Sequence, residues 1–177
     1  MNTVILAEKR TLSVMNKLIL AALCWMTFTS SAFAQKNEQI PFPSFRLLKM
    51  DSLSYLTNND IAEHKNTVFI NFSPTCEHCQ RTIKSILDNI VKFTETQFIL
   101  TSFEEFSTIR KFYFDNGLNS FSSVFIGQET DYSLTRQIKY SSFPCLVLFN
   151  RDNTYLKTID EESNAKMLLK ALKLNYK

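Results

Sequence analysis

The most constraining feature of the sequence is a pair of cysteines at the point where a buried strand gives way to an amphipathic helix. Residues 66–72 are rich in β-branched and aromatic side chains and too few for a helix, which predicts a buried strand. After Cys76 the apolar residues recur at spacings of three and four, which predicts a helix with one apolar face; they are Ile83, Ile86, Leu87, Ile90 and Val91. Cys76 and Cys79 therefore lie on the first turn of a helix that follows a central strand.

The rest of the chain predicts a mixed sheet covered by helices. A polar connection joins the last two strands, which predicts an antiparallel hairpin, and Gly117 ends the second helix. Residues 117–130 fit no single element. A strand-helix-strand half followed by a hairpin and a helix predicts one α/β domain with a central mixed β-sheet flanked by helices. The predicted segments are strands at 45–48, 97–103, 145–149 and 155–159, and helices at 104–116, 131–140 and 163–174.

The first 34 residues have the order of a secretory signal peptide. Lys17 precedes an apolar run at 18–26, and the small residues Ala32 and Ala34 predict cleavage after Ala34. Met15 is an alternative start that gives a more ordinary charged region. The apolar run is shorter than the roughly 20 residues that span a bilayer, and no later segment is long enough, so no transmembrane segment is expected in the mature chain. We expect one domain at 35–177, exported to the bacterial periplasm or cell envelope.

Composition excludes several other classes of function. The signal segment holds three basic residues and one acidic residue, so its removal lowers the net charge from +3 to about +1, which attracts neither nucleic acid nor an anionic membrane. With two glycines, the chain has no glycine-rich phosphate loop. His64 and His78 are the two histidines, too few for a zinc-hydrolase signature, and neither supports a Ser-His-Asp triad.

The placement of Cys76 and Cys79 points to thiol chemistry. A helix N-terminus stabilises an anion, so Cys76 is the expected thiolate, and the more buried Cys79 is the expected resolving thiol. A static disulfide is a second interpretation of the pair. A structural zinc site is a third, but it would need four ligands, and Cys145 and His64 are the ones left, at irregular spacing.

The residues around this pair resemble the thioredoxin superfamily, and its exported TlpA-type members in particular. The resemblance runs over residues 45–174 and rests on Phe72-Ser-Pro-Thr-Cys-Glu-His-Cys79, on Phe143-Pro144 and on the hairpin that follows. It implies a thioredoxin fold, a cis peptide before Pro144, and a loop at Phe143 and Pro144 that faces the cysteines and offers backbone groups to a substrate polypeptide. Two positions depart from the family: Thr75 replaces a frequent tryptophan, and Ile70 replaces a buried acid that assists proton transfer.

Three further residues bear on the pair, and two of them, His78 and Cys145, have two interpretations each. His78 is either an exposed polar residue or, as in strongly oxidising DsbA proteins, a group that stabilises the reduced thiolate and raises the reduction potential. Glu77 opposes that effect by placing a negative charge beside the same sulfur. Cys145 is expected to be a buried, inert strand residue, because it begins an apolar strand; the alternative is a third sulfur that traps the disulfide.

The sequence therefore predicts a thiol-disulfide oxidoreductase. Its partners would be client proteins with thiols or disulfides and a redox partner protein, and neither a cofactor nor a metal is expected. The alternatives are a thioredoxin-like binding module with a static disulfide and, with less support, a thiol peroxidase, because the Pro-x-x-x-Thr-x-x-Cys signature of peroxiredoxins does not occur around Cys76.

Overall fold

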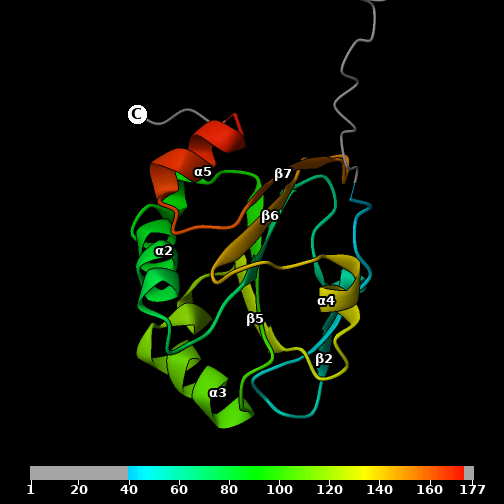
Figure 1. Cartoon of the computed structure of the whole chain (residues 1–177), viewed down its shortest axis with the longest axis vertical. Coiled ribbons are helices and arrows are strands. Elements are labelled where there is room, and N and C mark those ends of the chain that lie inside the picture. Colours follow the sequence, from blue (N-terminus) through cyan, green and yellow to red (C-terminus); the bar gives the residue numbers. More distant parts are fainter. Residues whose placement is uncertain (1–39, 174–177) are drawn as a thin grey trace, which may run out of the picture. The chain divides into compact units, whose positions relative to one another are not determined.

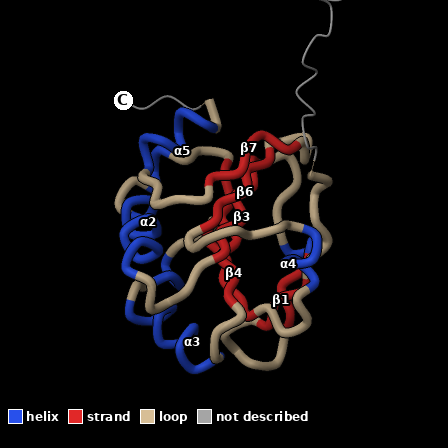
Figure 2. The backbone as a smooth tube through the Cα atoms, viewed as in Figure 1, coloured by secondary structure: helices blue, strands red, loops and turns tan. Residues whose placement is uncertain are grey.

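The computed structural model describes residues 40–173, which are built around a seven-stranded sheet (Figures 1 and 2). The predicted signal peptide and the alternative start lie outside the described residues. The strands are β1 (Arg46–Leu48), β2 (Tyr55–Thr57), β3 (Asn66–Asn71), β4 (Thr96–Ser102), β5 (Val124–Gln128), β6 (Cys145–Phe149) and β7 (Tyr155–Ile159). The α-helices are α2 (Glu77–Leu87), α3 (Phe106–Asp115), α4 (Ser133–Gln137) and α5 (Ala165–Ala171).

The sheet has the order β2-β1-β5-β4-β3-β6-β7. Strands β3, β4 and β5 run parallel, while β6 is antiparallel to β3, β7 to β6, β1 to β5 and β2 to β1. The predicted hairpin of β6 and β7 is confirmed with both predicted ranges. Every residue of β3, β4 and β6 is buried, as expected of strands covered on both faces.

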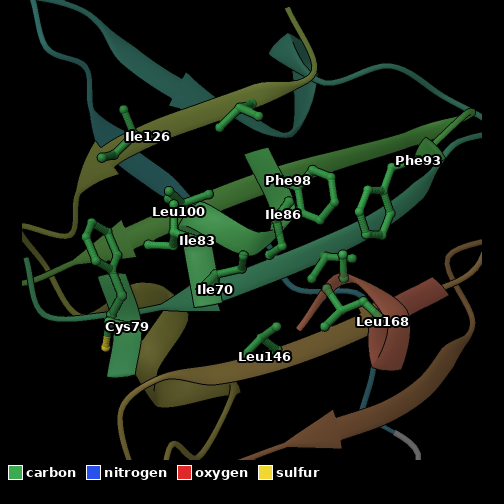
Figure 3. Packing of buried hydrophobic residues seen from close by; sticks show 14 of the residues in the cluster. Ile70, Cys79, Ile83, Ile86, Phe93, Phe98, Leu100, Ile126, Leu146 and Leu168 are labelled. Atoms are coloured by element: carbon green, nitrogen blue, oxygen red, sulfur yellow. The ribbon is translucent and has the colours of Figure 1, made fainter. Parts of the chain in front are cut away.

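Each face of the sheet carries its own apolar cluster, because side chains alternate along each strand. Helices α2, α3 and α5 cover one face, where Ile83, Ile86 and Leu168 pack against strand residues such as Ile70 and Leu100 (Figures 1 and 3). The other face is covered by α4 and by the segment ahead of β1. Its cluster is centred on aromatic rings, among them Phe42, Phe45, Phe69 and Phe149.

Two strands were not predicted from the sequence. Strand β5 lies within residues 117–130, to which no element was assigned, and it pairs with β4 over its whole length. It contains Gly127, which is unusual within a strand and here has a steric reason: a Cβ at this position would lie 2.5 Å from Leu47 Cβ on β1. Strand β2 has three residues, too few for a recognisable alternation.

The first predicted helix is shorter than its apolar spacing suggests. Helix α2 ends at Leu87, and a separate 3-10 turn covers Ile90–Lys92. Asn89 interrupts the helix with φ −120° and ψ 17°, and its side-chain amide donates to Ser85 O. The prediction that Val91 lies on the apolar face is wrong, because its side chain is 82% exposed.

Candidate active site

Cys76 occupies the N-cap position of α2, at the end of the loop that joins β3 to this helix. Its backbone is extended (φ −81°, ψ 117°), and its carbonyl accepts the first helical hydrogen bond from Gln80 N at 3.0 Å. The backbone N–H of Cys76 donates to Ser73 O at 3.1 Å, which closes the turn between strand and helix. The half-buried sulfur therefore lies where the unpaired N–H groups and the positive dipole end of α2 favour an anion.

Cys79 lies three residues after Cys76, on the first turn of α2, and is fully buried. It belongs to the apolar cluster between α2 and the sheet, together with Ile70 and Ile83 (Figure 3). Burial, followed by the hydrogen bond with Cys76, raises the pKa of the Cys79 thiol to about 12, and a hydrogen bond from the Ser73 backbone partly opposes this. The two thiols of the pair are therefore unequal: one is accessible, the other is buried and held protonated.

The loop before β6 meets this pair, as the resemblance implied. The Phe143-Pro144 peptide is cis, and the Cys76 Sγ atom lies 4.0 Å from Phe143 O. Pro144 is buried, whereas the Phe143 ring is 38% exposed. Residues 67 positions apart in the sequence thus border one reactive sulfur.

His78 is bound by a residue that sequence reasoning did not identify. Glu162, in the loop between β7 and α5, bonds to His78 Nδ1, and it accepts from Arg81 Nε at 2.8 Å and from an Arg81 terminal nitrogen at 2.9 Å. Arg81 and His78 together lower the pKa of Glu162 to about 2, with Arg81 the larger cause. Glu77 is highly exposed and approaches Arg81 at 3.5 Å. The two residues between the cysteines therefore sit in a charged network on the surface of α2.

Cys145 lies on the opposite face of the sheet from Cys79. It is fully buried in the cluster of aromatic rings, and burial, with the nearby Asp160 as a second cause, raises the pKa of its thiol. Burial of Cys145 was predicted and is confirmed. Since the sheet separates it from Cys79, the geometry favours the inert interpretation of this thiol over a third exchanging sulfur.

His64 and Cys145, the further ligands that a zinc site would need, are not brought together with the cysteine pair. Among residues 40–173, no group of three or more His, Cys, Asp or Glu side chains is arranged to hold a metal ion. His64 lies before β3 in a left-handed backbone conformation (φ 56°), at the end of that strand away from Cys76. In the same range, no helix is long and apolar enough to cross a membrane.

Comparison with known proteins rests on structure, because no family profile and no curated protein matches the sequence. A thiol:disulfide interchange protein of the thioredoxin family from Chlorobium tepidum superposes with a TM-score of 0.61 at 13% identity, covering 76% of this chain and 94% of that one. A secreted disulfide oxidoreductase of Mycobacterium tuberculosis superposes with a TM-score of 0.60 at 14% identity, covering 73% of this chain and 94% of that one. StoA from Bacillus subtilis superposes with a TM-score of 0.58 at 12% identity, covering 75% of this chain and 98% of that one. The chain has the thioredoxin fold.

Both departures noted in the sequence are visible on this thioredoxin fold. Ile70 is fully buried beside Cys79, so an apolar side chain stands where an acid would assist proton transfer. Thr75 is exposed, and its hydroxyl lies 3.1 Å from the Ser73 hydroxyl, which in turn donates to Glu104 Oε1 at 2.8 Å. The cysteine pair therefore has apolar surroundings on its buried side, at Ile70, and polar surroundings in the turn before α2, at Ser73 and Thr75.

The inequality of the three thiols predicts their order of alkylation. At pH 8 a thiol with a pKa of about 12 is thiolate in about one molecule in ten thousand, so iodoacetamide should label Cys76 in the native, reduced protein and leave Cys79 and Cys145 unlabelled. Because a raised pKa favours the protonated thiol, labelling of Cys79 should increase about tenfold per pH unit as pH rises toward that value. Mass mapping after digestion measures each site.

Protein unfolded in denaturant is the control for this experiment, since all three thiols should then react alike. Labelling of native Cys145 at the rate of Cys76 would contradict the assigned burial and would make Cys145 a third exchanging thiol.

Proposed function

We propose that this protein is a thiol-disulfide oxidoreductase of the exported TlpA-type, which exchanges disulfides with client proteins through Cys76 and Cys79. One observation carries the proposal: an accessible sulfur at a helix N-terminus stands beside both a buried partner thiol and the Phe143-Pro144 backbone. The named solved structures include a disulfide oxidoreductase and a thiol:disulfide interchange protein, which supports the same chemistry on this fold.

The proposed disulfide exchange needs no reactant other than the cysteine pair and the client disulfide. The Cys76 thiolate attacks one sulfur of a client disulfide, so a mixed disulfide forms and the client's other sulfur leaves as a thiolate. The Cys79 thiol then loses its proton and displaces the client from Cys76. The protein gains one disulfide and loses two electrons, the client gains two thiols, and the reverse sequence oxidises a client.

Removing each cysteine should have a different consequence. Cys79→Ser should accumulate clients covalently bound through Cys76, because the sulfur that releases them is gone, whereas Cys76→Ser should abolish both exchange and trapping. A non-reducing gel of envelope extracts from cells expressing each variant shows the trapped species. Cys145→Ser is the matched control and should retain exchange within about twofold.

Equal trapping of clients by Cys79→Ser and Cys76→Ser would contradict the assignment of Cys76 as the attacking thiol and Cys79 as the resolving thiol. Absence of trapping by either variant, with normal folding, would favour a binding module whose disulfide is static.

We further propose that His78 and Glu77 tune the reduction potential of the pair in opposite directions. A cationic imidazole near Cys76 stabilises the thiolate form and a carboxylate destabilises it. The contact between the His78 ring and Glu162 supports this, since a ring held in one place acts on Cys76 from a constant position.

His78→Pro should therefore lower the potential, and Glu77→Gln should raise it, each by roughly 30 mV, which corresponds to about 1.4 kcal/mol for a two-electron couple. Equilibration of the purified protein with glutathione buffers measures the values. His78→Gln is the matched control, because it keeps a hydrogen-bond donor for Glu162 without the charge. If His78→Pro and His78→Gln both leave the potential unchanged, His78 is a surface residue only.

We also propose that the protein works outside the cytoplasm after loss of residues 1–34. The order of charged, apolar and small residues in that segment supports export, as does the secreted Mycobacterium tuberculosis oxidoreductase that shares the fold. N-terminal sequencing of the protein from the cell envelope should find Gln35 first. Retention of Met1 or Met15 there would refute cleavage, which would remove Cys24 with the rest of residues 1–34.

A further inference from the structure

The loop between β7 and α5 is hydrogen-bonded to one side of α2. Ser163 N donates to Thr82 Oγ1 at 3.0 Å, and Ala165 N donates to Ser85 Oγ at 3.0 Å. Ser163 and Thr82 are both buried, so this attachment is shielded from water. Glu162 directly precedes Ser163, and its backbone is therefore held at a fixed place beside α2.

Glu162 reaches from this loop to a residue between the two cysteines. Its Oε1 atom accepts from Arg81 Nε at 2.8 Å, and its Oε2 atom accepts from Arg81 Nη2 at 2.9 Å and contacts His78 Nδ1. A two-point contact with a guanidinium fixes the orientation of a carboxylate. Arg81, and after it His78, lower the pKa of Glu162 to about 2, so the carboxylate is charged at neutral pH.

The Nδ1 atom of His78 faces two groups of opposite charge. The Arg81 Nη2 atom that donates to Glu162 also lies 2.8 Å from His78 Nδ1. A guanidinium can only donate a hydrogen bond and a carboxylate can only accept one, so these neighbours favour different states of the ring. Arg81 favours a neutral ring whose Nδ1 is an acceptor. Glu162 favours a proton on Nδ1, and its charge also stabilises the imidazolium.

Glu77 is not placed to do the same for His78. It approaches Nη1 of Arg81, at 3.5 Å, and its side chain is 84% exposed. Removal of the Glu162 charge would therefore leave the Arg81 guanidinium as the charged group in contact with Nδ1. A neighbouring cation disfavours a second positive charge, so the His78 ring would then carry its charge less often.

We propose that Glu162 is a positioning residue for the exchange: it holds the His78 ring in place and keeps it charged against Arg81, and thereby raises the reduction potential of the Cys76–Cys79 pair. This inference rests on the proposed function, in which a cationic His78 stabilises the Cys76 thiolate. Glu162 acts through His78, the residue that it contacts between the two cysteines.

A direct effect of Glu162 on the cysteines would have the opposite sign. A carboxylate destabilises a nearby thiolate, so removal of its charge alone would stabilise the reduced protein and raise the reduction potential. Action through His78 predicts that the same removal lowers the potential. The direction of the change therefore distinguishes the two effects.

The test measures the equilibrium between the protein and glutathione. Reduced protein and one oxidised glutathione give protein with a Cys76–Cys79 disulfide and two reduced glutathiones. Glu162→Gln, which keeps the size of the side chain and removes its charge, should raise the equilibrium constant of this oxidation about two- to fivefold, the range expected of a partly exposed ion pair. Glu161→Gln is the matched control, because it removes the same charge at the exposed neighbouring position, and it should leave the constant unchanged.

The same substitution in His78→Gln protein shows whether the effect passes through the imidazole. With no imidazole at position 78, Glu162→Gln should leave the equilibrium constant unchanged or lower it. An increase of equal size in both backgrounds would overturn the proposal, because Glu162 would then act on the structure and not through His78. A constant that falls or stays the same when Glu162→Gln is made in the wild type would overturn it too.

The charge of the ring can be followed separately by NMR. At a pH of about 6.5, where an imidazole changes charge, the ring signals of His78 should show a smaller imidazolium fraction in Glu162→Gln than in the wild type. His64, the other histidine of the chain, is the internal reference and should show the same fraction in both proteins. Equal fractions for His78 in the two proteins would overturn the proposal.

The glutathione equilibrium also separates this inference from the proposed function on which it rests. If His78→Gln has the equilibrium constant of the wild type, tuning by His78 and the role of Glu162 both fail, and the oxidoreductase stands. If His78→Gln changes the constant and Glu162→Gln does not, the role of Glu162 alone fails. Failure of the wild type to react with glutathione would overturn the exchange as well.

Discussion

The packing of the first turns of α2 against β3 is the interaction on which the whole site depends. Ile83 and Ile86 place one helix face against the sheet, and with them Cys79 is buried beside Ile70 (Figure 3). Helical spacing then leaves no choice for Cys76, which must lie at the helix end and near the surface. The difference in burial between the two thiols is therefore a consequence of the amphipathic packing of α2.

Strand register brings the second half of the site to the same place. Asn71, the last residue of β3, lies opposite Cys145, the first residue of the antiparallel β6. The residues that leave β3 and those that enter β6 must therefore meet at one edge, and this juxtaposes Cys76 with Phe143 and Pro144. The parallel pairing of Asn71 with Thr101 brings the end of β4 to the same edge. A shift by one residue would turn the side chains of β6 to the other face and bury Cys145 against α2 instead.

Features that depend on only a few neighbouring residues were predicted correctly from the sequence. The cysteine pair, the strand before it, the hairpin at 145–159 and the burial of Cys145 were all predicted, since each follows from composition or periodicity within a few residues. Strand β5 was not, because Gly127 and serine-rich flanks weaken the strand pattern, and its stability comes from pairing with β4 and β1. Glu162 could not be found either, because it is one of three consecutive acids and only tertiary structure brings it to His78.

The apolar residue Ile70 also shapes the second step of the proposed exchange. In the free protein, burial is the largest cause of the raised pKa of Cys79, and its hydrogen bond and electrostatic interaction with Cys76 add to it. When Cys76 is joined to a client, its sulfur carries neither a proton nor a charge, so the contributions of Cys76 to the raised pKa of Cys79 are lost. The pKa of Cys79 must then fall from about 12, although burial beside Ile70 keeps it above that of a free thiol. In the proposed exchange, formation of the mixed disulfide would thus activate the thiol that resolves it, without an acid at position 70, and the backbone N–H of Ser73 would stabilise the Cys79 thiolate as it forms.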